Sequence, residues 1–371
     1  QRHRWLCGYV ISVCLPVPSR MDDKVEGSKP VEVKPAARVQ WAPIKIPLYR
    51  RLQTLGALTW ISIFLFLGPA TILFFAVLLI TEYYFISWLY LAYLVYDWNT
   101  PVSGGRRNEW IRSWSVWRWF RDYFPITMIK TAELPADNNY IFVCHPHGVL
   151  PAAAFACLST NALDFYGTFP GLKPFLLTLR ENYYVPGFRE IFMASGATAA
   201  TSDNIDSLLS RQGKGNVLGL IVGGAQEALN TREDEIELIL KNRKGFIKKA
   251  LVHGAHLVPV FTFGENEIYT QIPNPKGSWL RTIQDSFQHY FGLAPVLFLG
   301  RGVFQYNFGI LPKRKYLYFV VGEPIQVEVN PNPTHEDVDL LHAEYTKQLM
   351  ELYENNKMKY SRNPNIPLII T

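Results

Sequence analysis

Two short polar motifs, each directly after an apolar run, hold the residues with the chemistry of a catalyst. The apolar run Tyr140–Cys144 is followed by His-Pro-His-Gly at 145–148, and Val217–Val222 is followed by Gly-Gly-Ala-Gln-Glu at 223–227. If both runs are strands of one sheet, a histidine and a glutamate meet where the strands end. Such a pair is typical of a general base and the carboxylate that orients it.

The reaction that this pair favours is acyl transfer to an alcohol. An alcohol attacks a thioester too slowly unless its proton is removed as the new bond forms. A neutral imidazole, with an ordinary pKa of about 6.5, suits that step at physiological pH. A carboxylate on the other ring nitrogen fixes the tautomer, and the neighbouring glycines allow backbone N–H groups to approach a developing oxyanion.

Other interpretations of the same residues stay open. A histidine at a strand end is often structural, and the two histidines of the first motif could bind zinc together with His253 and His256. Cys144 could be a nucleophile, but its place in an apolar run favours a small core residue. The absence of a Gly-x-Ser-x-Gly sequence argues against an α/β hydrolase. We predict no metal site.

The elements that must position the two motifs alternate between strand and helix patterns. Two further apolar runs, Leu257–Phe261 and Tyr316–Val321, resemble buried strands. Helical stretches lie between the strands, for example Asp203–Arg211 and Lys244–His253. Residues 126–371 are therefore predicted to form an α/β domain with a largely parallel sheet, whose active site lies at the carboxyl ends of the strands.

A long uncharged segment precedes this domain. No residue from Leu52 to Thr81 is charged, and after Glu82 the run Tyr83–Tyr96 is uncharged again. Lys and Arg flank both ends, which favours a cytosolic position for both. We predict a transmembrane helical hairpin over residues 52–98 with its turn near Glu82, and a kink at Gly68-Pro69. A pair of buried core helices is the alternative.

Residues 104–125 are predicted to form an amphipathic helix. Its aromatic side chains recur at helical spacing, with arginines on the remaining surface. The aromatic set is Trp110, Trp114, Trp117, Phe120 and Phe124. This pattern favours a helix that lies in the membrane interface, with packing on the protein core as the alternative.

The remaining composition places the domain in a reducing compartment. The 371 residues carry a net charge of +6 and only four cysteines, without metal-ligand or disulfide spacing. Residues 1–51 are predicted to be a cytosolic segment. Within it, residues 1–20 are suspected not to be native, because Met21 resembles a true start, and a signal peptide is the competing interpretation. We expect no nucleic-acid partner and a possible homo-oligomer.

Several motifs in the same order resemble the type-2 diacylglycerol O-acyltransferase family, which includes monoacylglycerol and wax-alcohol acyltransferases. The resemblance runs from about Leu52 to the C-terminus. The motifs are Tyr123-Phe124-Pro125, His145-Pro146-His147-Gly148, Phe169-Pro170-Gly171, Val222-Gly223-Gly224-Ala225-Gln226-Glu227, Arg243-Lys244-Gly245-Phe246-Ile247-Lys248, Gly254-Ala255-His256-Leu257-Val258-Pro259-Val260-Phe261 and Phe263-Gly264-Glu265.

This resemblance implies a glycerolipid-acyltransferase-like domain that esterifies diacylglycerol with acyl-CoA. The protein would be an endoplasmic reticulum membrane protein, multi-pass with cytosolic termini, that also reaches lipid droplets. His147 would be the base and Glu227 its partner, with His145 and Gly148 shaping the site. Phe64-Leu65-Phe66-Leu67 resembles the family's proposed neutral-lipid-binding motif, which singles out Phe64, Leu65 and Leu67.

Acyl-CoA is expected as a substrate, without any further cofactor. Its phosphates need cations, and Arg243, Lys244, Lys248 and Lys249 are the candidates, with a solvated helix face as the alternative. Diacylglycerol or another lipid alcohol, together with membrane lipid, completes the expected partners.

Two departures from the wider glycerolipid acyltransferases refine the prediction. Those enzymes have an Asp five positions after the histidine, where this chain has Ala152. They also have an Arg after the glutamate that helps to hold a phosphorylated acceptor, whereas Glu227 is followed by Ala228-Leu229-Asn230. An uncharged acceptor therefore fits better. A thioesterase or ester hydrolase and a non-catalytic lipid-droplet hairpin protein remain the alternative classes.

Overall fold

A seven-stranded sheet forms the centre of the protein in the computed structural model, which describes residues 9–10, 38–211, 213–291 and 293–371. The suspected non-native residues 1–20, and with them Cys7 and Cys14, lie almost wholly outside these ranges. In spatial order the strands are β2 (Ile126–Lys130), β12 (Leu317–Val321), β8 (His256–Phe263), β3 (Tyr140–His145), β6 (Asn216–Leu220), β4 (Lys173–Thr178) and β5 (Ala197–Ala199). All neighbours run parallel except β12 and β8.

The four predicted strands are therefore confirmed as members of one largely parallel sheet. Every residue of β3 and β6 is buried, as expected of parallel strands covered on both faces. The two predicted helical stretches are confirmed as well. Residues 203–211 lie in α9 (Ser202–Asp206) and a following π-helical turn, η4 (Ser207–Arg211), and residues 245–253 form α11 (Gly245–His253).

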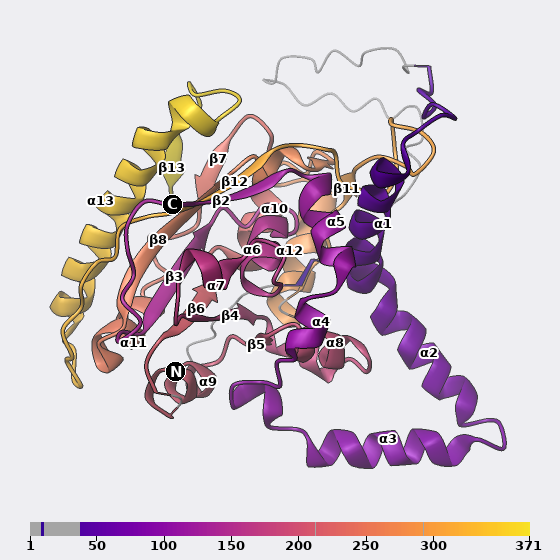
Figure 1. The fold of residues 1–371 in the computed structure, drawn as a ribbon, viewed down its shortest axis with the longest axis horizontal. Coiled ribbons are helices and arrows are strands. Elements are labelled where there is room, and N and C mark those ends of the chain that lie inside the picture. The colour runs from indigo at the N-terminus through magenta and orange to yellow at the C-terminus, as the bar shows by residue number, and fades with distance from the viewer. Residues whose placement is uncertain (1–8, 11–37, 212, 292) are drawn as a thin grey trace.

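Helices cover the sheet on two sides, which gives three layers. The long α13 (His335–Tyr360) packs against β8 and α11 on one side, whereas α6 (Ala152–Leu158) packs against β12 and β4 on the other (Figure 1). Further helices are α7 (Phe165–Thr168), α8 (Phe188–Ala194), α10 (Gly224–Asn230) and α12 (Trp279–Phe291). Three small two-stranded sheets pair β1 (Tyr9–Val10) with β10 (Leu293–Ala294), β9 (Thr270–Gln271) with β11 (Phe298–Leu299), and β7 (Ile236–Leu238) with β13 (Leu368–Ile370).

Local sequence signals define the start and the buried face of α13. The Thr334 hydroxyl accepts a hydrogen bond from the Asp337 N–H, and the Asp337 carboxylate accepts one from the Thr334 N–H, which forms a capping box. The buried residues of the helix are Val338, His342, Tyr345, Leu349, Leu352 and Tyr353. Their spacing of three and four, apart from the final adjacent pair, forms one apolar stripe that faces the sheet.

The first uncharged run is helical throughout but has two different environments. It begins in α1 (Leu48–Ser62), passes through a π-helical turn η1 (Ile63–Leu67) and continues as α2 (Gly68–Leu78). Ala57, Trp60 and Ile61 are buried in the domain, whereas most of α2 is exposed. Residues 48–78 are the one stretch of the described chain that is long and apolar enough to cross a membrane.

The irregularity predicted at Gly68-Pro69 takes the form of this π-helical turn. Proline has no N–H with which to continue the ladder of helical hydrogen bonds, and π-turns are a common consequence. In Figure 1 the chain changes direction between α1 and α2 at this place. The turn thus separates the half of the helix that packs on the domain from the half that leaves it.

The second uncharged run forms α3 (Tyr84–Tyr96), and the predicted turn near Glu82 lies between α2 and α3. The two helices make a V that protrudes from the domain (Figure 1). They touch where the rings of Phe75 and Tyr90 stack at 4.4 Å and the Ser87 hydroxyl donates to the Phe75 carbonyl. At its far end α3 is tied back to the domain by an ion pair between Asp97 and the buried Arg189.

Residues 104–125 differ from the prediction of one interfacial helix. They form two short helices, α4 (Glu109–Arg112) and α5 (Ser115–Tyr123). Trp117, Phe120 and Phe124 are buried and pack around Phe155 of α6 and Trp60 of α1. The alternative of packing on the core is correct for these three rings, because α1 supplies an apolar partner that the isolated segment does not reveal. Trp110 remains 72% exposed.

Candidate active site

The order of the central strands brings three polar strand ends together. β3 lies between β8 and β6 and runs parallel to both. His147 follows β3, Glu227 follows β6 on the first turn of α10, and Glu265 follows β8. The predicted meeting of the His-Pro-His-Gly motif with Glu227 is therefore confirmed.

Glu227 contacts the backbone of the histidine motif and not its ring. One carboxylate oxygen accepts the backbone N–H of His147, and the other accepts the N–H of Ile239 at 3.1 Å. The side chain folds back so far that a Cβ at Gly223 would lie 2.0 Å from its Oε2, so glycine is required there. The predicted bond between this carboxylate and the imidazole is wrong, because the backbone N–H groups occupy both of its oxygens.

The ring of His147 takes its orientation from Gly148 instead. Its Nδ1 lies 3.0 Å from the Gly148 carbonyl oxygen. A carbonyl oxygen can only accept, so Nδ1 donates and Nε2 keeps the lone pair. Gly148 has a φ of 61°, a left-handed conformation that glycine adopts without strain. The tautomer that a general base needs is thus present, supplied by a backbone carbonyl.

Burial sets the charge states at this point of the sheet. His147 is 3% exposed, and desolvation lowers its pKa to about 4, so its ring is neutral at physiological pH. Desolvation raises the pKa of Glu227 to about 7, although the two backbone N–H groups act in the opposite direction. A neutral imidazole beside a carboxyl with a raised pKa is a combination found more often at functional sites than elsewhere.

His145 faces a different part of the protein. Its Nε2 lies 2.9 Å from the Tyr345 hydroxyl of α13, and Nδ1 has no hydrogen-bond partner among the described residues. Burial lowers its pKa to about 3. The ring therefore links β3 to α13, and the structure does not bring it to Glu227.

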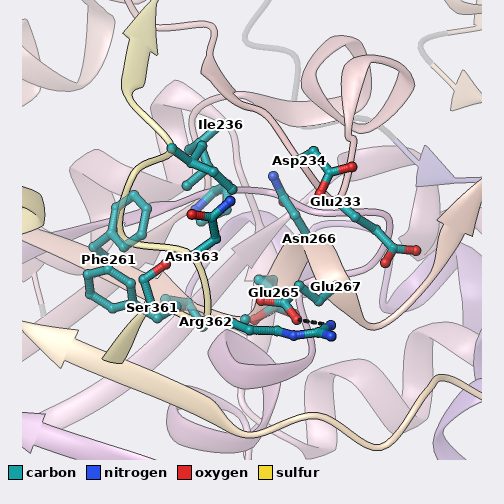
Figure 2. Close-up of a pocket in the computed structure, with 15 residues that line it drawn as sticks. Glu233, Asp234, Ile236, Phe261, Glu265, Asn266, Glu267, Ser361, Arg362 and Asn363 are labelled. Atoms are coloured by element: carbon teal, nitrogen blue, oxygen red, sulfur yellow. Dashed lines mark ion pairs between the residues drawn. The ribbon is translucent and has the colours of Figure 1, made fainter. Parts of the chain in front are cut away.

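A cavity of about 300 Å³ opens beside the histidine motif. Pro146, between the two histidines, lines it together with Glu265. Figure 2 shows other polar residues of the cavity, which come from the loop between α10 and β7, from the loop after β8 and from the chain after α13. They include Glu233, Asp234, Asn266, Glu267, Arg362 and Asn363. Four of the five charged or ionisable residues in the wall are acidic and the rest are apolar or neutral polar, which suits neutral groups and disfavours phosphates.

The metal and nucleophile alternatives find no support in the described residues. His253 bonds Asp206 at 2.6 Å, and the Nδ1 of His256 accepts the N–H of Val327. Within those residues no group of three or more His, Cys, Asp or Glu side chains converges as metal ligands do. Cys144 is buried in β3, as expected of a small core residue.

The four candidate phosphate-binding cations do not form one cluster. Lys249 bonds Asp206 at 2.6 Å, Lys244 bonds Asp339 at 2.7 Å, and Lys248 points to solvent. Arg243 lies 3.5 Å from Gln226, one residue before Glu227. Lys244 also lines an open groove of about 550 Å³ between the turn before α11 and α13, with Lys241, Lys347, His342 and Thr346. Three lysines and one glutamate, Glu351, make the groove basic on balance.

Two of the three residues of the predicted lipid-binding motif lie against the domain core. Phe64 and Leu65 pack against the core, where Phe64 touches the rings of Phe188 and Phe192, and their contact with neutral lipid stays a prediction. Leu67 is half-buried. Glu265 was named in the sequence only as the end of the Phe263-Gly264-Glu265 motif and was given no role, although it follows an apolar strand as Glu227 does.

The site is a neutral imidazole at the strand ends of an α/β domain, from which two largely apolar helices protrude. The protein-family model for diacylglycerol acyltransferase matches residues 76–371. The chain therefore belongs to the diacylglycerol acyltransferase family and is an acyltransferase.

Relatives with two acceptor specificities support this assignment. The bovine 2-acylglycerol O-acyltransferase 1 is 46% identical over 332 residues, which cover 90% of this chain and 99% of that protein. The mouse Diacylglycerol O-acyltransferase 2 is 46% identical over 312 residues, which cover 84% of this chain and 80% of that protein. Among solved structures, the 1-acyl-sn-glycerophosphate (LPA) acyltransferase PlsC from Thermotoga maritima is similar over 84% of this chain and 97% of that chain, with 12% identity and a TM-score of 0.38.

Proposed function

We propose that the protein transfers a fatty acyl group from acyl-CoA to the free hydroxyl of diacylglycerol, with His147 as general base. The observation that carries the proposal is the tautomer of this histidine. The Gly148 carbonyl holds the proton on Nδ1, so Nε2 has the lone pair that must accept the hydroxyl proton. Membership of the diacylglycerol acyltransferase family supports the same reaction.

The transfer proceeds in one ternary complex, without an acyl-enzyme. Nε2 removes the hydroxyl proton as the oxygen attacks the thioester carbonyl. The C–S bond then breaks, and CoA leaves as a thiolate, which is an adequate leaving group with a pKa of about 8.5 by analogy with cysteine. The proton on the imidazole passes to the thiolate, so the enzyme returns to its neutral form. Glu227 acts through the backbone of His147, which it holds in place.

The acyl-CoA phosphates bind the basic groove between the turn before α11 and α13, together with Arg243, next to Lys244 in the sequence. The groove carries Lys241, Lys244 and Lys347, and Arg243 connects it to Gln226, next to Glu227. Lys248 and Lys249 contribute less, because one points to solvent and the other is paired with Asp206. Cations pair strongly with phosphate, whereas the acidic groups that line the cavity beside Pro146 repel it.

The membrane part is proposed to be the V of α2 and α3, inserted with the turn at Glu82 deepest along its path. Both ends of such a hairpin return to the cytosolic side of the endoplasmic reticulum membrane, from which lipid droplets are also reached. The helices measure roughly 16 and 20 Å at about 1.5 Å per residue. A bilayer core is about 30 Å thick, and the continuous helix over residues 48–78, of which α2 is the second half, is long enough to cross it and to place the turn at Glu82 near the opposite headgroups.

Monoacylglycerol is the second candidate acceptor, because the bovine relative is named for 2-acylglycerol and is as similar as the mouse relative named for diacylglycerol. A long-chain alcohol is the third. The residues after Glu227 are Ala228 and Leu229, both buried, so no cation stands there to bind a charged acceptor.

One assay separates these possibilities. Purified protein in lipid nanodiscs receives labelled oleoyl-CoA with diolein, 2-monoolein or hexadecanol, or with no acceptor. We expect triacylglycerol as the fastest product, and a His147→Ala protein as the control that makes none. Faster acylation of 2-monoolein would show that monoacylglycerol is the preferred acceptor, and the protein would still be an acyl-CoA-dependent acyltransferase. Release of free oleate at the same rate with and without acceptor would overturn the transferase reaction.

A further inference from the structure

The second buried carboxylate beside the histidine motif, Glu265, is used by no step described so far. Its Oε1 accepts the backbone N–H of Ala152 at 2.6 Å, and its Oε2 accepts that of Ala153 at 3.3 Å. These are the first two residues of α6, whose N–H groups lack partners within the helix. Glu265 is 2% exposed, and none of its hydrogen bonds or ion pairs among the described residues involves a cation.

Glu265 also supports the glycine that orients the imidazole. A Cβ added at Gly148 would lie 3.0 Å from the Glu265 Cγ and 3.3 Å from its carbonyl oxygen. The stem of Glu265 therefore packs directly against Gly148. Because the Gly148 carbonyl holds Nδ1 of His147, a shift of this stem moves the acceptor that sets the tautomer.

The catalytic loop is thus held at both ends by carboxylates from the two strands that flank β3. Glu227, after β6, holds the N–H of His147 at the start of the loop. Glu265, after β8, holds the N–H groups of Ala152 and Ala153 at its end, five and six residues further on. Between them lie only Gly148, Val149, Leu150 and Pro151, which make no hydrogen bond to either carboxylate.

We propose that Glu265 is a positioning residue for acyl transfer, which fixes the catalytic loop from the β8 side so that Nε2 of His147 points at the acceptor hydroxyl. The inference rests on the proposed function of His147. A cap alone does not require a carboxylic acid, since Ser, Thr or Asn caps helices as well. Burial raises the pKa of Glu265 to about 8, a cost that a cap at the protein surface does not carry.

The first test compares three variants of the full-length protein in nanodiscs with oleoyl-CoA and diolein. Glu265→Ala should lower kcat by about 10²-fold, the effect of misplacing a catalytic group by about 1 Å. Glu265→Gln keeps one acceptor oxygen and should lower kcat by about tenfold. KM for oleoyl-CoA should stay within about twofold in both, because the loop does not hold CoA.

Asp337→Asn is the matched control. Asp337 caps α13 through a backbone N–H, as Glu265 caps α6, but it lines neither the cavity nor the groove. Its kcat should equal that of the wild type. A Glu265→Gln protein with the wild-type Tm and a kcat within about twofold of the wild type would overturn the proposal.

A second test separates positioning from general damage. If Glu265 acts through His147, then Glu265→Ala should cause no further loss in a His147→Ala background, because the group that it positions is gone. Equal fractional losses in both backgrounds would show that Glu265 acts on the whole fold, and the proposal would fail. Normal turnover by His147→Ala alone would instead overturn the proposed function, so the two failures are distinguishable.

Discussion

The strand ends around His147 and the helix pair α2–α3 place polar and apolar side chains in opposite ways. At the strand ends, His147, Glu227 and Glu265 are all buried, and each is held by backbone hydrogen bonds. In α2 and α3, leucine, phenylalanine and tyrosine side chains are exposed. Burying an ionisable group costs free energy, and so does exposing a large apolar surface to water. A protein that keeps either feature generally uses it for function. The first region therefore indicates chemistry and the second indicates lipid.

The largest expected effect is a loss of catalysis at the strand ends without a loss of membrane binding by α2 and α3. His147→Ala removes the base and should lower kcat for triacylglycerol synthesis by about 10²–10⁴-fold. The fraction of protein recovered with membranes should not change, since the side chain lies far from the exposed helices in sequence and is buried in the sheet. The rate of triacylglycerol formation from labelled oleoyl-CoA measures kcat, and sedimentation with membranes measures membrane binding. Near-normal turnover would contradict the catalytic assignment.

A substitution in α2 should have the converse effect and weaken lipid binding without changing kcat. Leu73 of α2 is 65% exposed, and a lysine near the middle of a membrane helix costs about 2.5–3.5 kcal/mol. Leu73→Lys should therefore weaken binding to phosphatidylcholine vesicles by about 10²-fold, with kcat in detergent unchanged. Leu340→Lys in α13 is the control, because Leu340 is equally exposed, at 66%, outside the uncharged runs. Equal losses for both leucines would place the lipid contact elsewhere.

The third prediction tests whether burial raises the pKa of Glu227 at the strand ends. The pKa of Glu227 is raised from 4.5 to about 7, so the folded protein binds an additional proton between these values. Its contribution to the free energy of unfolding therefore falls as pH rises through this window, by roughly 3 kcal/mol. Glu227→Gln lacks this proton. The Tm of the wild type minus that of the variant should be larger at pH 5 than at pH 7.5, and a constant difference would contradict the burial argument.

The smallest expected effect concerns a third surface, the basic groove. Lys347 is exposed in that groove, and Lys347→Glu should raise KM for oleoyl-CoA by about fivefold, as one reversed charge near phosphate would. Salt should weaken the effect. Lys359→Glu, an exposed lysine further along the same helix, should leave KM unchanged. If both variants raise KM equally, the phosphates respond to overall charge and not to the groove.

Much of the fold and half of the site followed from local patterns. The apolar runs at 140–144, 217–222, 257–261 and 316–321 are strands, and the two motifs after the first two do meet. These predictions succeeded because burial on both faces leaves a continuous apolar run in the sequence. Three atomic details were not predictable from such patterns. They are the bond of Glu227 to the backbone, the Gly148 acceptor for Nδ1, and the contact of Glu265 with α6.

The uncharged segment shows what hydropathy alone does not predict, namely whether an apolar side chain is covered by protein or by lipid. Its composition is uniform from residue 52 to 81, yet Trp60 is buried in the domain while Leu73 is exposed. The aromatic residues Trp117 and Phe120 matched an interfacial helix by spacing and turned out to be core. Hydropathy reports that a side chain avoids water, but the partner that shields it can be lipid or protein.

By itself, the sequence determined which segments leave water, which polar residues stand at strand ends, and that a histidine and a carboxylate meet there. Those properties depend on side-chain chemistry and on periodicity along the chain. Only the tertiary structure decided which nitrogen of His147 is free, which carboxylate holds which N–H, and which half of the apolar helix is covered. The carboxylate contacts join residues about 80 to more than 110 positions apart, which no local pattern contains. The contact that frees Nε2 joins adjacent residues, but it requires the backbone conformation that the fold imposes at Gly148.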